Sequence, residues 1–435
     1  MKRKAFILTT AFMLFAMAYS FAQNETQQEG ALSISLKSAQ DYAVEHNKTL
    51  QNSSLEIQKA EAAKWGAIAS MLPQISASLG YSNYCGYEMN FGMMSMSMPA
   101  TGTLGITASM ALSGQQIIGV QLAEMSKDLS DLTKKQSEDE IRYQVAKVYM
   151  SILVMQNTTE LLERSLENLE SLQQTTQNAV DVGAAEQTDA DKLMVQVLSL
   201  RTSINSTNRS LEMLENSLRL QLGCGVNTKL TLTQTVDDIL KPEAILALQN
   251  ESFNIENNYD YQLLQKNSEL LKKQIDLKIM GYVPTLSAYY QYSGRTYFGQ
   301  KEGFNMTPPN LIGLTLNIPI WSSGKTWSDV KQAKITYNEF QNTIENTRDA
   351  LLVQERQLRY NVTSNYETYE AQKLNIEVTE RVFTNVSNKF EHGMASSLEL
   401  TTASSDIISA QSSYISAVLN LVNAQIEFEQ LLNRK

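Results

Sequence analysis

Residues able to carry out catalysis are scarce in this chain of 435 residues. The two histidines, His46 and His392, lie far apart in the sequence and form no ligand cluster. The sequence contains no glycine-rich phosphate-binding loop, no HExxH motif and no nucleophile elbow, and no histidine stands near a plausible nucleophile. The sequence therefore predicts a protein that is not an enzyme and that needs no cofactor.

One short segment is rich in sulfur. Thioether and thiol groups suit Cu(I) or Ag(I), but methionines also provide flexible packing in loops. The segment joins the first two strands predicted below, at the end away from the long helices, so packing is favoured and no metal site is predicted. Cys85 and Cys224 lie in different kinds of segment and are predicted to be unpaired thiols. The methionines beside Cys85 are Met89, Met93, Met94, Met96 and Met98.

The first 22 residues are predicted to be a signal peptide. Three basic residues precede an apolar run over residues 5–18, and the small residues Ser20 and Ala22 precede a cut at Gln23. A glutamine at the cut gives no attachment site for lipid. Loss of the three positive charges changes the net charge from -10 to -13, so the exported chain is acidic and a nucleic-acid partner is not expected.

Four segments alternate strictly between apolar and polar residues and are predicted to be strands. Their polar faces carry mainly Ser, Thr, Asn, Gln and Gly. No later segment is long and apolar enough for a membrane helix. If the chain enters a bilayer, its strands must therefore close into a barrel, with the apolar faces toward lipid and the polar faces toward the interior. The predicted strands cover residues 73–84, 103–113, 284–298 and 311–321.

Aromatic residues stand at both ends of these strands, where membrane interfaces place them. Ordinary core aromatics are the alternative interpretation. The prolines Pro73, Pro284 and Pro319 are predicted to mark the junctions between strands and helices. The predicted interface aromatics are Tyr84, Tyr87, Phe91, Tyr297 and Phe298 at one end, and Trp321 and Trp327 at the other.

The same unit is predicted to occur twice, in residues 23–230 and in residues 231–435. Pro73 and Pro284 head similar segments at an offset of 211 residues, and Gly183 and Gly393 do so at an offset of 210. Each half reads as a short helix, a helix, two strands, a very long helix and a last helix.

Two predicted helices are much longer than the helices of an ordinary globular domain. Residues 115–182 and 325–392 contain no proline and, apart from Gly119, no internal glycine, so each predicts a helix about 100 Å long. Two shorter helices stacked end to end nearly match each long one. Apolar residues spaced by seven predict coiled-coil packing between them. The shorter helices are predicted at residues 49–72 and 188–222 in the first half, and at 260–283 and 397–432 in the second.

Four strands cannot close a transmembrane barrel, because the smallest barrels use eight. The chain is therefore expected to oligomerise, and a trimer would supply twelve strands. Over nearly all of its mature length the sequence resembles the TolC family of outer-membrane efflux proteins. The resemblance rests on SLKSAQDYAVEHN, the prolines before the strands, the doubled helix–turn–helix with Gly183 and Gly393, and NKFEHGMASSLELTTASSDIISAQ.

The resemblance implies a mixed α and β membrane protein. Its homotrimer would form a twelve-stranded barrel in the outer membrane of a Gram-negative bacterium and a coiled-coil helical tunnel across the periplasm. Such a duct serves efflux or type I secretion, and it works with a periplasmic adaptor and an inner-membrane transporter. The adaptor is expected to dock on the helical tips, in turns at residues 183–188 and 393–397. The docking residues are predicted to be Gly183, Ala184, Ala185, Gly393, Met394 and Ala395.

The resemblance also places a gate at the tips. Glu399 corresponds to the first acidic residue of the family's constriction ring, and Thr402 stands at the second acidic position. Ala395 replaces the arginine that can lock the neighbouring helix pair, which leaves Asp189 as the predicted gate partner from the first half. Carboxylates converging on an axis attract cations and bind divalent ions. A solvated helix face is the alternative interpretation for Glu399 and Asp189.

An exported coiled-coil structural protein or adhesin without channel activity is the competing function. Such a protein would not need four strands with apolar outer faces. Drug efflux and protein secretion both stay open, because the inner-membrane transporter selects most of the cargo.

Overall fold

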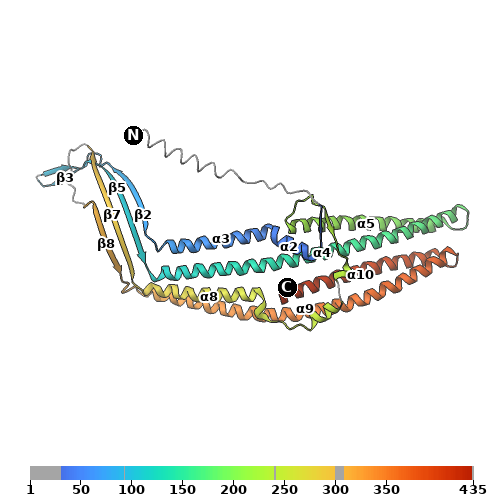
Figure 1. The fold of residues 1–435 in the computed structure, drawn as a ribbon. Coiled ribbons are helices and arrows are strands. Elements are labelled where there is room, and N and C mark those ends of the chain that lie inside the picture. The colour runs from blue at the N-terminus through green and yellow to red at the C-terminus, as the bar shows by residue number, and fades with distance from the viewer. Residues whose placement is uncertain (1–30, 93, 240–241, 299–307, 434–435) are drawn as a thin grey trace.

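The chain is long and narrow, with a sheet at one end and helical hairpins extending from it (Figure 1). The structure is a computed structural model and describes residues 31–92, 94–239, 242–298 and 308–433. The predicted signal peptide, residues 1–22, lies outside the described residues. No helix in the described part of the chain has a stretch apolar enough to span a bilayer.

Four antiparallel strands form the sheet, in the order β2, β5, β7, β8. They are β2 (Gln74–Ser82), β5 (Ala100–Leu112), β7 (Thr285–Phe298) and β8 (Asn310–Asn317). Each half of the chain supplies two adjacent strands, and β5 pairs with β7 to join the halves. Among the residues that the structure describes, β2 and β8 each pair on one side only, so within this part of the chain both edges of the sheet are unpaired.

Two very long helices leave the sheet, α4 (Gly114–Asp181) and α9 (Lys325–Glu391), of 68 and 67 residues. At 1.5 Å per residue each is about 100 Å long. Ser113 starts α4 with a capping box, in which its Oγ accepts from the Gln116 N–H and the Gln116 side chain accepts from the Ser113 N–H. The predicted long helices are confirmed to within one residue at each end.

Two shorter helices lie end to end along each long one (Figure 1). In the first half these are α3 (Lys48–Ala69) and α5 (Gln187–Leu222), and in the second half α8 (Tyr259–Ile279) and α10 (Ser397–Leu432). Apolar side chains fill the seams between neighbouring helices, with Val197, Leu421 and Phe428 among the fully or almost fully buried ones.

An asparagine joins the stacked helices in each half. Asn47 caps α3 and donates from Nδ2 to the Gln221 carbonyl near the end of α5, at 2.7 Å. Asn258 caps α8 and donates to the Leu431 carbonyl near the end of α10, at 3.4 Å. The two asparagines lie 211 residues apart, so the predicted repeat extends to the caps.

Smaller elements gather at the middle of the molecule. The strands β1 (Leu32–Ile34) and β6 (Leu230–Leu232) pair in parallel, and α2 (Leu36–His46), α6 (Val236–Ile239) and α7 (Pro242–Gln249) pack beside the long helices. The hydroxyl of Tyr149 on α4 donates to the Ile34 carbonyl at 3.1 Å, which fastens β1 to that helix. Burial raises the pKa of the Tyr149 phenol.

The helices predicted over residues 49–72 and 260–283 end earlier, at Ala69 and Ile279, and three further features differ from the sequence prediction. The fourth strand ends at Asn317 instead of residue 321, because Pro319 has no N–H to donate to a neighbouring strand. The methionine-rich segment contains a hairpin of β3 (Glu88–Phe91) and β4 (Met94–Ser97), where a loop was predicted. The parallel pair of β1 and β6 was not predicted.

Candidate functional site

The sheet has one exposed apolar face. Strand register places Ala77 opposite Ile106, Ile106 opposite Tyr292, and Leu286 opposite Leu316, so the apolar residues of all four strands share a side. Leu79 is 85% exposed and Ile312 is 79% exposed. Exposed apolar area of this extent indicates a surface that contacts lipid or protein.

Aromatic residues lie at both ends of the sheet. Pairing of Thr101 with Tyr297 and of Ala100 with Phe298 places these rings at the same end as Tyr84, which follows β2. Trp321 and Trp327 follow β8 at the opposite end, and both are exposed. Lys331 Nζ lies 4.9 Å from the centre of the Trp327 ring.

Trp65 belongs with these residues and was missed in the sequence. It lies on α3 just before β2, and it is 63% exposed. All three tryptophans of the chain therefore lie where helices meet the sheet. Its position could have been predicted from the sequence, because Trp65 precedes Pro73 by only eight residues and Pro73 marks a predicted helix–strand junction.

Pro73, Pro284 and Pro319 lie at the helix–strand junctions, as predicted. Pro73 directly precedes β2, Pro284 directly precedes β7, and Pro319 lies between β8 and α9. Ion pairs stabilise the helices beside them. A hydrogen bond from Lys64 holds the pKa of Glu124 below its usual value, and one from Lys325 does so for Asp329.

The far ends of the helical hairpins form two matching tips. Gly183 follows α4 with φ +77°, and Gly393 follows α9 with φ +70°. In each tip the next N–H turns back to a helix carbonyl, from Ala184 to Ala179 at 2.8 Å and from Met394 to Lys389 at 2.7 Å. This is the Schellman arrangement, which favours glycine because an added Cβ strains a left-handed residue.

Small and apolar side chains cover the tips. Met394 is 70% exposed and Val182 is 79% exposed, while Ala185 and Ala395 are half-buried. Leu398 is 66% exposed and was not among the predicted tip residues. The tips therefore expose Val182, Met394 and Leu398 close in the chain to the exposed carboxylates of Glu186 and Glu399.

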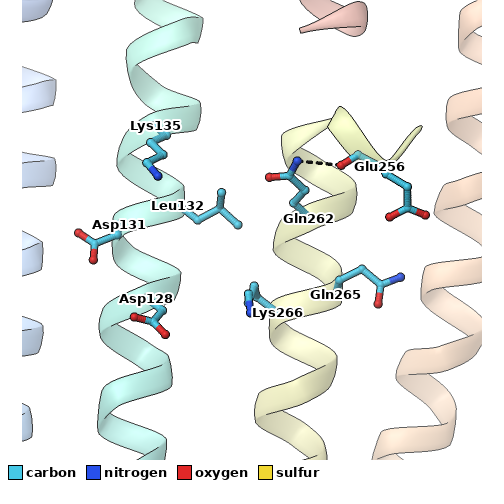
Figure 2. Close-up of a pocket in the computed structure, with 8 residues that line it drawn as sticks. All are labelled: Asp128, Asp131, Leu132, Lys135, Glu256, Gln262, Gln265 and Lys266. Carbon is cyan, nitrogen blue, oxygen red and sulfur yellow. Dashed lines mark hydrogen bonds between the residues drawn. The ribbon is translucent and has the colours of Figure 1, made fainter. Parts of the chain in front are cut away.

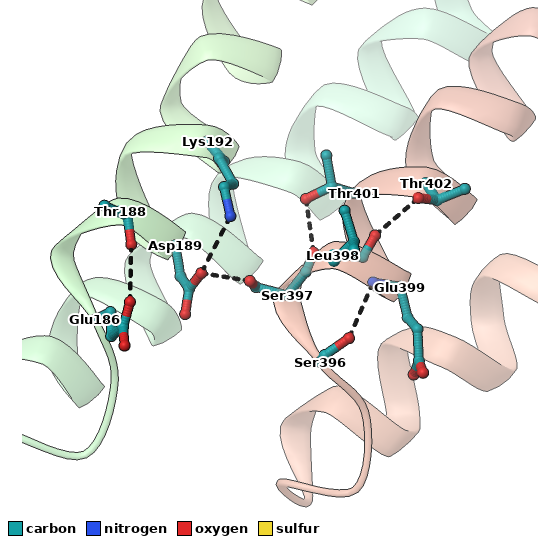
Figure 3. Close-up of polar contacts among 10 residues, drawn as sticks. All are labelled: Glu186, Thr188, Asp189, Lys192, Ser396, Ser397, Leu398, Glu399, Thr401 and Thr402. Carbon is teal, nitrogen blue, oxygen red and sulfur yellow. Dashed lines mark hydrogen bonds and ion pairs between the residues drawn. The ribbon is translucent and has the colours of Figure 1, made fainter.

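Hydrogen bonds tie the two tips to each other (Figure 3). The Ser397 hydroxyl on α10 donates to Asp189 Oδ1 on α5, and Lys192 Nζ lies 3.6 Å from the same oxygen. One turn further on, Gln196 Nε2 donates to the Thr401 carbonyl at 3.1 Å. Leu193 and Leu400 are fully buried beneath these contacts. Asp189 therefore links the two halves of the chain at their ends.

The other predicted gate residues do not join this link. Glu399 is exposed, its N–H donates to Ser396 Oγ at 3.3 Å, and no described residue pairs with its carboxylate. The Thr402 hydroxyl donates to the Leu398 carbonyl of its own helix at 2.9 Å. Ala395 offers only a methyl group. Within one chain, the structure brings Asp189 to Ser397, a partner that the sequence did not indicate.

A groove of about 500 Å³ lies between α4 and α8 (Figure 2). Leu132, Gln262 and Lys266 border it, whereas Asp131 and Glu256 point away from its centre in the figure. Its side chains do not converge on a common point.

The described residues contain no group of three or more His, Cys, Asp or Glu side chains placed to hold a metal ion. Met93 lies outside the described residues. Register places Met89 opposite Met96 in the β3–β4 hairpin. Cys85 is an exposed free thiol, and Cys224 is a half-buried free thiol whose pKa is raised by burial.

The fold and these surfaces define an elongated protein whose exposed apolar sheet lies at one end of long helical hairpins, with linked tips at the other end. A family model described as outer membrane efflux protein matches residues 39–224 and 254–434. The chain belongs to this family, the TolC family. Membership places it in the outer membrane of Gram-negative bacteria, extending into the periplasm.

Two curated relatives are outer membrane proteins named TolC. The one from Salmonella enteritidis is 24% identical over 325 residues, which cover 71% of this chain and 63% of the relative. The one from Escherichia coli K12 is 22% identical over 383 residues, which cover 84% of this chain and 75% of the relative. The chain thus spans a little under two thirds of the Salmonella relative.

Solved structures share the fold at low identity. CusC superposes with a TM-score of 0.75 at 16% identity, covering 95% of both chains. The outer membrane channel CmeC of Campylobacter jejuni has a TM-score of 0.74 at 14% identity, covering 91% of this chain and 85% of its own. VceC of Vibrio cholerae has a TM-score of 0.72 at 12% identity, covering 91% and 95%. The architecture is therefore that of outer membrane channel proteins.

Proposed function

We propose that three copies of the chain assemble into a passive duct that lets cargo leave the cell through the outer membrane. The observation that carries this proposal is the four-stranded sheet, which has an exposed apolar face and two unpaired edges. Unpaired edges expose N–H and C=O groups that a bilayer cannot satisfy. Pairing β8 of one copy with β2 of the next removes every edge once three copies close a ring.

Twelve strands then form a barrel whose apolar face meets lipid and whose polar face lines the lumen. The exposed tryptophans mark the membrane interface nearer the helices, and Tyr84, Tyr87 and Phe298 mark the other. Strand register puts Tyr297, opposite Thr101, on the polar face instead. The helices continue the lumen away from the membrane as a coiled-coil tunnel about 100 Å long.

The linked tips are the proposed periplasmic gate. The bond between Asp189 and Ser397 holds α5 against α10, and thereby holds the two hairpins of one chain together. Glu399 leaves its carboxylate free to face its two copies across the axis. Release of the Asp189 link lets the second hairpin move outward and widens the opening.

A periplasmic adaptor and an inner-membrane transporter are the proposed partners. Three copies of two tips give six docking points, and the exposed Met394, Val182 and Leu398 suit the apolar side chains of a helical partner. Docking there acts directly on the residues that link the tips. The tips therefore serve both docking and gating.

Electron microscopy of the detergent-extracted full chain tests the duct. We expect a threefold particle well over 100 Å long, with the detergent belt at the sheet end only. A monomer, or a rod without a belt, would contradict the barrel. That result would favour an exported coiled-coil structural protein or adhesin.

A further inference from the structure

The four-stranded sheet carries a single charged side chain. Arg295 on β7 is the only Asp, Glu, Lys or Arg within β2, β5, β7 and β8. It lies three residues before Phe298, near the end of the sheet farthest from the helices. Its side chain is exposed, and no acidic group of the described residues pairs with it.

Strand parity places Arg295 on the polar face. Leu286, Ala288 and Tyr290 on the same strand belong to the apolar face, and Arg295 is an odd number of residues from each. Its partner across the strand pair is Thr103, which also lies on the polar face. The other polar-face residues of the sheet are uncharged, so Arg295 is the only charge that the four strands contribute at this level.

We infer that three copies of Arg295 form a cationic ring near the outer end of the duct, which favours anions and anionic cargo and opposes cations. This rests on the proposed function, because it needs the polar face of the sheet to line the lumen. The ring has the opposite sign to the carboxylates of Glu399 at the tips. A cargo molecule thus meets acidic groups at the entrance and basic groups at the exit.

The dimensions of the barrel make the ring effective at physiological salt. Twelve strands about 4.8 Å apart and tilted by about 40° close to a backbone diameter of about 24 Å. An arginine that extends about 6 Å inward places its guanidinium about 6 Å from the axis. The Debye length at physiological ionic strength is about 8 Å, so the three charges are felt across the whole lumen.

Single-channel recording in planar bilayers tests the ring, with inositol hexakisphosphate as a polyanionic probe. We expect the wild-type trimer to be blocked from one side only, and more weakly as salt is raised. Arg295→Gln should weaken this block about tenfold or more, because a charged opening of this kind concentrates counter-ions by about that factor. Arg295→Lys should retain the block, since it keeps the charge.

Arg164→Gln is the matched control. Arg164 is an exposed arginine on α4, paired with Glu160 and far along the chain from the sheet, and its loss changes the net charge by the same amount. Heat-resistant trimer on gels shows that each variant assembles. Equal block of wild type and Arg295→Gln would overturn the ring and leave the duct intact. Absence of any wild-type conductance would overturn the duct, and the ring with it.

Discussion

At the scale of single residues, the bond between Ser397 and Asp189 is the contact that holds the proposed gate closed. A hydrogen bond to a charged group contributes about 1.5–3 kcal/mol, and one in a partly exposed site contributes less. Ser397→Ala removes the donor but keeps the backbone of α10. We therefore expect the open probability of single channels to rise several-fold, since 1.4 kcal/mol corresponds to about tenfold.

Thr207→Ala is the control for this variant. The Thr207 hydroxyl on α5 donates to the Ser203 carbonyl of its own helix at 3.0 Å, so its loss breaks no contact between hairpins. A Ser397→Ala channel with wild-type open probability would show that this bond does not hold the gate closed.

The sequence indicated one half of this contact. Asp189 was predicted because the resemblance places a gate at the tips. Ala395 occupies the position of the locking arginine, which left Asp189 as the gate residue of the first half. Ser397 did not stand out, because serine is common at helix starts and its partner lies 208 residues away. A pairing between repeats depends on the angle between two hairpins, which no local pattern specifies.

At the scale of elements, the tip turns depend on left-handed glycines. In Gly183→Ala, a side chain at φ +77° costs about 1–2 kcal/mol, although the space around it is open. We expect the Ala184 amide, which bonds to Ala179, to exchange its hydrogen about tenfold faster. Hydrogen exchange of the intact protein measures this rate, when it is followed in the proteolytic fragment that contains the tip.

Gly66→Ala is the matched control within a helix. Gly66 lies inside α3 with nothing within 4 Å of an added Cβ, and its φ is not positive. Alanine there should favour the helix by about 0.5–1 kcal/mol and leave exchange at the tip unchanged. Similar exchange at the tip in both variants and wild type would mean that the glycine conformation does not limit tip opening.

The elements themselves differed in how well the sequence predicted them. The long helices followed from runs without proline, and the four strands followed from strict alternation, because both patterns extend over many residues. The strands β1 and β6 have three residues each, too few for a pattern, and they pair across a long stretch of chain that no local pattern reveals. The hairpin of β3 and β4 was hidden because methionine and serine have no marked strand preference.

At the scale of the whole molecule, the two ends of the chain have opposite surface chemistry. The sheet end exposes apolar strands flanked by aromatic residues, and the helices expose mostly polar and charged residues. In the proposed barrel the exposed apolar strand residues meet lipid, so the strand face that a residue occupies decides whether a charge placed there prevents insertion. Adjacent residues on one strand point to opposite faces, so a neighbouring pair can separate insertion from folding.

Leu314 and Thr315 on β8 are such a pair. Leu314 lies on the apolar face opposite Ala288, and it is 73% exposed, whereas Thr315 lies on the polar face opposite Ser287. Leu314→Lys places a charge in lipid, at a cost of about 2–4 kcal/mol near the bilayer centre in each copy. Thr315→Lys places the same charge in the aqueous lumen. We expect heat-resistant trimer in the outer-membrane fraction to fall steeply for Leu314→Lys and to stay near wild type for Thr315→Lys. Equal loss in both variants would mean that the two faces of the sheet do not differ in environment, and the barrel would then have no physical basis.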